Sequence, residues 1–87
     1  MQPVIRKPTE EEKKIASKWP IWEKEKSKFP WKYSEQETCL IIDGDVIITN
    51  SEGQEFNFGA GDFVVFPEGM KCTWDIKRNV RKYYKFG

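Results

Sequence analysis

Because the sequence contains no histidine, the side chains with which it could do chemistry are Tyr33 and, above all, Glu37, Cys39 and Cys72. The absence of imidazole excludes Ser-His and Cys-His nucleophile pairs, histidine acid/base catalysis and every metal site built on histidine. Strand alternation would place Glu37 and Cys39 on the same face. Two thiolates and a carboxylate can hold zinc, so these three residues are metal candidates, although their spacing matches no zinc signature.

Short apolar segments separated by turn residues make up most of the chain after residue 20. They are 21–25, 29–33, 37–42, 46–49, 54–58, 63–66, 70–76 and 80–86. Strands at intervals of about 8 to 12 residues predict an all-β sandwich or barrel. Asp43-Gly44 predicts a hairpin between two of these strands. Further turns are predicted at 50–53, 59–62 and 67–69.

The N-terminal segment is predicted to hold a short strand and one short helix. Residues 4–5 suit the strand, and Thr9 should begin the helix, because Thr with Glu three residues later forms a capping box. The helix should end before Trp19-Pro20, since proline disfavours helix in the residue ahead of it. We therefore expect a single domain over residues 1–87, with the strand and helix in 1–20 and the barrel in 21–87.

The charges are unevenly distributed along the chain. Residues 33–70 carry eight acidic side chains and no Lys or Arg, although the net charge of the whole chain is only +1. We interpret this as charge balancing within the fold or across a dimer rather than as an anion-binding surface. The basic and aromatic run from Lys77 to Lys85 could stack on single-stranded nucleic acid, but lysines that protect an edge strand explain it better. No nucleic-acid partner is expected.

The cellular location is predicted from the apolar segments. The start of the sequence lacks the apolar run of a signal peptide, and no segment is long and apolar enough to span a membrane. We therefore expect an intracellular, cytoplasmic protein with reduced cysteines and no membrane partner.

Two spaced patterns combine turn residues with candidate ligands. In the first, Glu37 is followed after six residues by Gly44, and the second runs from Gly61 through Pro67-Glu68-Gly69 to Cys72. Both patterns resemble the two conserved motifs of the cupin superfamily, in which histidines bind a metal. The resemblance implies a double-stranded β-helix, or jelly-roll barrel. It also implies that the glycines and the proline keep the turns of that fold.

The histidines of the cupin motifs are all replaced in this sequence. Their positions hold Trp31, Tyr33 and Cys72, whereas the motif glutamate is kept as Glu37. The chain also resembles the small single-domain cupins grouped with the ureidoglycine aminohydrolase cupin domain, the cupin-3 group. The segments that carry this resemblance are 18–24, 37–39, 61–67 and 72–74. Aminohydrolase activity is not implied, because the metal ligands that such chemistry would need are missing.

We expect a ligand site at the barrel mouth, made of Trp31, Tyr33, Glu37, Cys39, Cys72 and Trp74. The aromatic side chains would line a pocket for a small organic ligand, and Glu37 and Cys72 would make polar contacts with it. No cofactor is expected for this function.

Two alternative functions stay open. The first is an enzyme acting on a small nitrogenous or sugar-like substrate, with or without a metal, for which Glu37, Tyr33 and Cys72 are the catalytic candidates. The second is a structural or interaction scaffold, since cupins frequently pair through their sheet edges. A homodimer is expected on the same ground.

Overall fold

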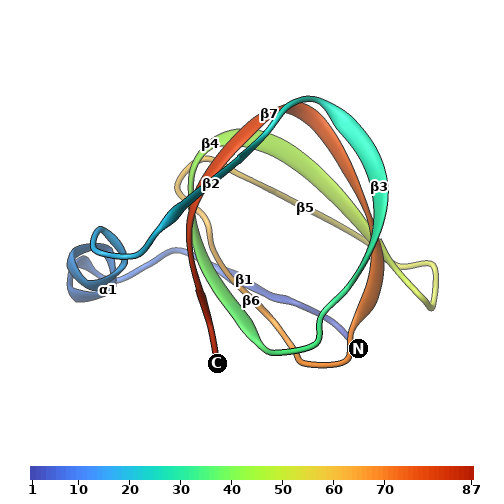
Figure 1. Cartoon of the computed structure of the whole chain (residues 1–87), viewed down its shortest axis with the longest axis horizontal. Helices are drawn as coiled ribbons and strands as arrows, with labels where there is room; N and C mark the ends of the chain where they lie inside the picture. Colours follow the sequence, from blue (N-terminus) through green and yellow to red (C-terminus); the bar gives the residue numbers. More distant parts are fainter.

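The structure, a computed structural model, describes residues 1–87 and contains one helix and seven strands in a single curved antiparallel sheet (Figure 1). The strands are β1 (Val4–Arg6), β2 (Ile21–Lys24), β3 (Ser27–Lys32), β4 (Glu37–Asn50), β5 (Glu55–Gly59), β6 (Phe63–Phe66) and β7 (Lys71–Phe86). The helix α1 (Glu10–Ala16) projects from the outside of the barrel, at the left of Figure 1. The predicted all-β jelly-roll fold with one short helix is confirmed.

The helix α1 begins where its capping residues predict. Thr9 accepts a hydrogen bond from the backbone N–H of Glu12, whose carboxylate accepts one from the backbone N–H of Thr9. The hydrogen bond from Arg6, together with that from Thr9, lowers the pKa of Glu12 to about 2. The helix ends at Ala16, ahead of Trp19-Pro20 as predicted. No helix in this protein is long and apolar enough to cross a membrane.

Two long strands, β4 and β7, form the frame of the barrel. They pair with each other from Glu37 opposite Phe86 to Asn50 opposite Cys72. Each long strand has two shorter strands on its other side: β6 and β5 along β4, and β3 and β2 along β7. Because β4 and β7 bend, the shorter strands enclose a common interior (Figure 1). Strand β1 pairs with β6, so the N-terminal segment continues the barrel sheet.

The predicted hairpin at Asp43-Gly44 is wrong, because β4 continues through this dipeptide. The register with β7 shifts between Ile41 and Val46, which marks β-bulges that bend the strand without ending it. Gly44 has a φ of +125°, and a Cβ at this position would lie 2.8 Å from Cα of Val80. The glycine is therefore needed for a bulge that fits closely against β7, and pairing with β7 holds both halves of β4 in one strand.

Strand β7 also differs from its prediction. The segments 70–76 and 80–86, expected as two strands, are joined in one strand that begins at Lys71, lies between β4 and β2 and is not at an edge. The edge-strand explanation is therefore wrong for Lys82, which is only 4% exposed. Its side chain points into the barrel because Val80, two residues earlier, is an inward-facing core residue.

The uneven charge distribution is balanced within the fold. The acidic middle of the chain meets basic residues from both ends, as the pairs Glu37–Lys82 and Asp62–Lys7 show. Exposed ion pairs such as Asp62–Lys7 contribute only about 0 to 1 kcal/mol to the free energy of unfolding. The pair Glu37–Lys82, in contrast, is buried and places two charges inside the barrel.

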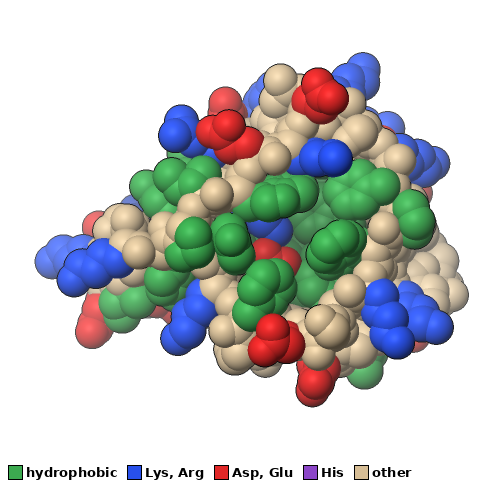
Figure 2. Space-filling model, viewed as in Figure 1, with side chains coloured by type: hydrophobic (Ala, Val, Ile, Leu, Met, Phe, Trp, Pro, Cys, Tyr) green, Lys and Arg blue, Asp and Glu red, His purple; other side chains and the backbone are tan.

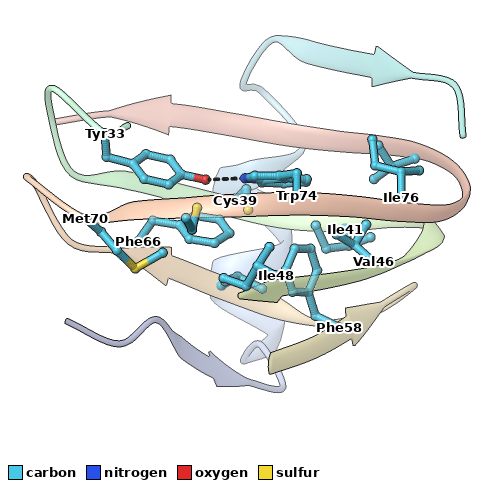
Figure 3. Close-up of a cluster of buried hydrophobic side chains, with 13 residues drawn as sticks. Tyr33, Cys39, Ile41, Val46, Ile48, Phe58, Phe66, Met70, Trp74 and Ile76 are labelled. Carbon is cyan, nitrogen blue, oxygen red and sulfur yellow. Dashed lines mark hydrogen bonds between the residues drawn. The ribbon is translucent and has the colours of Figure 1, made fainter. Parts of the chain in front are cut away.

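The barrel interior holds a cluster of 13 buried residues, most of them apolar (Figure 3). Phe58, Phe66 and Trp74 lie at its centre, with ring centroids 5.5 to 5.8 Å apart in edge-on or tilted contacts. Such geometries align the positive edge of one ring with the negative face of another. The result is a large aromatic core for so short a chain.

A smaller cluster attaches α1 to the outer face of the sheet. Ala16 of α1, Leu40 of β4 and Phe63 of β6 are buried together, and Trp19 packs against them. Leu40 follows Cys39 directly, so strand alternation sends these two side chains to opposite faces of β4. The sheet therefore separates Trp19 from the barrel interior.

Gly44→Ala should lower the free energy of unfolding more than Gly53→Ala. Both glycines have positive φ, but an added Cβ meets the Val80 backbone at 2.8 Å at position 44 and nothing within 4 Å at position 53. We expect losses of about 3 kcal/mol and about 1 kcal/mol, respectively. Urea denaturation followed by tryptophan fluorescence measures both values. Equal losses would contradict the close approach of β4 and β7 at the bulge.

Candidate functional site

One acidic and one basic residue are buried in the barrel, and they contact each other. Lys82 Nζ donates a hydrogen bond to Glu37 Oε2 at 2.6 Å, and the two residues are 4% and 3% exposed. All other acidic and basic residues of the chain are at least partly exposed. Because a buried charge without a partner costs about 3 to 5 kcal/mol, each of these side chains depends on the other.

The two charged residues come from distant positions on the frame strands. Glu37 begins β4, whereas Lys82 lies near the end of β7, opposite Ile41. The long lysine side chain runs inside the barrel toward the end at which β4 begins. The pairing of β4 with β7 therefore brings together two residues that are 45 positions apart in the sequence.

Aromatic rings surround the Lys82 ammonium. Its Nζ lies 4.8 Å from the ring centroid of Trp22, 4.9 Å from that of Trp74 and 5.9 Å from that of Phe66. Cation–π attraction is worth about 2 kcal/mol when water is excluded, so these rings offset part of the desolvation of the charge. Aromatic rings therefore surround the Lys82 ammonium on several sides, and the Glu37 carboxylate is its polar contact.

Tyr33 adds a hydroxyl to the same interior. It accepts a hydrogen bond from Trp74 Nε1 at 3.1 Å (Figure 3), and its ring stacks on Phe66 with centroids 4.7 Å apart. Burial, and then the negative charge of Glu37, raise the pKa of Tyr33 well above its ordinary value. The hydroxyl is therefore protonated at neutral pH. It donates no hydrogen bond within the chain, which leaves its hydrogen for a ligand.

These groups meet at a cavity of about 220 Å³ that opens to solvent. Figure 2 shows a hollow rimmed by hydrophobic side chains, with basic and acidic atoms at its floor. The lining consists of Glu37, Lys82 and seven aromatic residues, namely Trp22, Phe29, Trp31, Tyr33, Trp74, Tyr84 and Phe86. Trp31 and Phe86 are about half exposed and lie at the mouth, whereas Tyr33 and Trp74 are buried.

Comparison with known families decides which kind of barrel this is. The family model of the EutQ-like cupin domain matches residues 11–84, which is most of the chain. The protein belongs to the EutQ-like cupin family. The cupin resemblance that the spacing of Glu37, Gly44 and the segment 61–72 indicated is thereby confirmed.

Solved structures place this cupin among proteins of the same fold. A DUF861 family protein from Thermotoga maritima is 43% identical over 99% of this chain and 100% of its own, with a TM-score of 0.95. EutQ from Salmonella typhimurium is 21% identical with a TM-score of 0.68, over 76% of this chain. EutQ from Clostridium difficile is 23% identical with a TM-score of 0.69, also over 76% of this chain. The cupin spans about half of each EutQ chain, and its likeness to them shows the fold alone.

Proteins with curated functions offer no further guide, since a search among them gives no match.

A metal of the kind that histidine cupins bind does not fit this barrel. No group of three or more His, Cys, Asp or Glu side chains lies close enough together to hold an ion, and this includes Glu37, Cys39 and Cys72. Glu37 is also bonded to Lys82, whose positive charge would repel a metal cation. That the cupin works without any cofactor stays a prediction.

The two cysteines are buried behind the cavity and do not line it. Cys39 has no exposed surface, and burial raises the pKa of its thiol to about 12. Burial also raises the pKa of Cys72 to about 11. Both are free thiols. Because the thiolate is the nucleophile and the metal ligand, two thiols that stay protonated at neutral pH suit neither role.

Four of the six ligand-site residues expected from the sequence line the cavity of this cupin. They are Trp31, Tyr33, Glu37 and Trp74. Their positions follow from the cupin motifs and from strand alternation, which are both visible in the sequence. The two cysteines, although inward-facing as expected, lie behind the aromatic lining.

Lys82 and four of the aromatic lining residues were not predicted from the sequence. Strand alternation could have indicated Lys82. Val80 is a core residue, so Lys82 and Tyr84, two and four residues later, also face into the barrel. The four aromatic lining residues that were not predicted are Trp22, Phe29, Tyr84 and Phe86. They come from β2, β3 and the end of β7, whose positions beside the motif residues depend on the strand pairing.

Lys82→Met should destabilise this cupin strongly, and adding Glu37→Gln should restore much of the loss. The single change leaves the Glu37 carboxylate buried without a partner, at a cost of about 3 to 5 kcal/mol. The double variant buries no charge, and replacing a buried ion pair by uncharged groups of similar size is often close to neutral. Urea denaturation of the wild type, both single variants and the double variant measures the coupling. If the loss of stability in the double variant equals the sum of the losses in the two single variants, the direct pairing of Glu37 and Lys82 is contradicted.

Proposed function

We propose that this cupin binds a small, uncharged organic molecule in its aromatic cavity, without a metal ion. The observation that carries the proposal is the composition of the cavity, in which seven aromatic side chains surround a single Glu–Lys pair. Ligand sites are typically apolar clefts in which a few polar groups fix the orientation of the ligand. Here Glu37, Lys82 and Tyr33 are those polar groups.

The ion pair favours an uncharged ligand. Glu37 and Lys82 neutralise each other, so the floor of the cavity offers no net charge to an anion or a cation. A charged ligand would lose its water shell without gaining a counter-charge, which is unfavourable in an apolar cavity. A neutral group such as an amide, an alcohol or a carbonyl can instead accept a hydrogen bond from the Tyr33 hydroxyl.

The size of the cavity limits the ligand. Its volume of about 220 Å³ lies below the range of about 300 to 1,000 Å³ that is usual for drug-sized molecules. A single ring that carries one polar group is of suitable size. Such a ring would lie between the aromatic side chains, with its polar group toward the floor and Trp31 and Phe86 at the mouth.

The alternative functions have less support. An enzyme that uses Glu37 together with Cys72 is not favoured, because Cys72 does not line the cavity. A scaffold that pairs through its sheet edges would leave the polar groups of the cavity without a role. The homodimer stays a prediction, and light scattering of the full chain tests it.

Neutral single-ring compounds should raise the Tm of this cupin more than charged compounds with the same ring. Benzamide and benzyl alcohol are the neutral probes, and benzoate and benzylammonium are the matched charged ones. A ligand at ten times its Kd stabilises by about 1.4 kcal/mol, or about 6 to 11 °C in Tm for a domain of this size. A thermal-shift assay measures the response.

Two variants separate binding in the cavity from binding elsewhere. Trp31→Ala removes a half-exposed ring at the mouth and should abolish most of the response while the fold is kept. Glu55→Gln changes an exposed residue of β5 outside the cavity and should leave the response intact. An unchanged response in Trp31→Ala, or equal responses to neutral and charged probes, would contradict the proposal.

A further inference from the structure

One lysine of this cupin differs from the other eleven in its surroundings. The others are exposed, whereas Lys82 is buried and lines the floor of the cavity. Its Nζ contacts the Glu37 carboxylate at 2.6 Å and lies under the faces of Trp22 and Trp74. An amine at the end of an aromatic cavity, beside a proton acceptor, is an arrangement suited to covalent chemistry.

We propose that Lys82 forms a reversible imine with an aldehyde or ketone whose apolar body lies in the aromatic cavity. The inference rests on the proposed small-molecule function and names the substrate class as carbonyl compounds. It gives the buried lysine a role that binding alone does not require.

Glu37 provides the proton transfers that the reaction needs. It accepts one proton from the Lys82 ammonium along their 2.6 Å hydrogen bond, which leaves a neutral amine and a carboxylic acid. The direct hydrogen bond gives the proton a path between the two groups. The amine nitrogen then attacks the carbonyl carbon, and a C–N bond forms while the carbonyl π electrons move to oxygen.

Loss of water completes the imine. One of the two protons that remain on the nitrogen moves to the former carbonyl oxygen, which becomes a hydroxyl. Glu37 returns its proton to this hydroxyl, the C–O bond breaks, and water leaves. The ammonium and the carbonyl compound have then become a protonated imine and one water molecule, and the total charge is unchanged.

The product keeps the contacts that stabilise the free protein. The protonated imine carries its positive charge at the former Nζ position, beside the Glu37 carboxylate and near the rings of Trp22 and Trp74. The Tyr33 hydroxyl, which donates no hydrogen bond within the chain, is a donor for the carbonyl oxygen before attack. The aromatic walls limit the access of water that would hydrolyse the imine.

Reductive trapping tests the proposal on the full chain. The protein is incubated with limiting benzaldehyde and sodium cyanoborohydride, which converts an imine into a stable benzylamine, and labelled lysines are located by peptide mass spectrometry. Labelling of Lys82 should exceed that of any exposed lysine by about tenfold or more, because the cavity holds the ring next to the amine. Labelling spread evenly over the exposed lysines would overturn the proposal.

Three variants show whether the arrangement itself is responsible. Lys82→Arg keeps a positive charge for Glu37 but cannot form an imine, so the selective label should disappear. Lys85→Arg removes an exposed lysine three residues away and should leave it unchanged. Glu37→Gln cannot accept the proton and should slow labelling of Lys82. Labelling at an unchanged rate in Glu37→Gln would overturn the assigned role of Glu37.

Benzyl alcohol separates failure of the imine from failure of the binding function. It has the same ring as benzaldehyde but no carbonyl group. If both compounds raise the Tm and Lys82 is not labelled, the imine is overturned and the proposed function stands. If neither compound raises the Tm and Lys82 is not labelled, both are overturned.

Discussion

The buried contact between Glu37 and Lys82 is the interaction on which the rest of this cupin depends. Two charges inside an apolar barrel are tolerated only when they are paired and otherwise compensated. A 2.6 Å hydrogen bond provides the pairing, and the faces of Trp22 and Trp74 provide further compensation. The contact requires the start of β4 to pair with the end of β7, because Glu37 and Lys82 lie in these two segments.

The same contact distinguishes this barrel from the metal-binding cupins that its motifs resemble. In those cupins, histidines hold a metal together with the conserved glutamate, whereas here a lysine ammonium is the cation next to Glu37. The three histidine positions hold Trp31, Tyr33 and Cys72, so the cavity gains aromatic surface and loses metal ligands. The chemistry it can support then changes from that of a metal ion to that of an amine and a carboxylate.

Much of the fold could be predicted from local sequence signals. The capping box at Thr9 and the turns at 50–53, 59–62 and 67–69 depend on a few neighbouring residues, and the structure contains all of them. The Asp43-Gly44 signal failed because the same dipeptide suits a hairpin and a bulge. Only the long-range pairing of β4 with β7 decides between the two.

The site was predicted in part for a related reason. Trp31, Tyr33, Glu37 and Trp74 could be found because motif spacing and alternation act within a short stretch of sequence. Alternation in the last strand also indicated an inward-facing Lys82, but a lysine is expected to be exposed unless a buried partner is known. That partner lies 45 residues away, on another strand.

The location of ligand binding tests the central claim most directly, and the four tryptophan indoles report it in one ¹H–¹⁵N NMR titration with benzamide. Trp22, Trp31 and Trp74 line the cavity, whereas Trp19 lies on the other side of the sheet and serves as an internal control. We expect the signals of the three cavity indoles to shift together and saturate, and that of Trp19 to stay in place. A saturating shift confined to Trp19, or no shift of the cavity indoles at millimolar benzamide, would contradict a binding site built around Glu37 and Lys82.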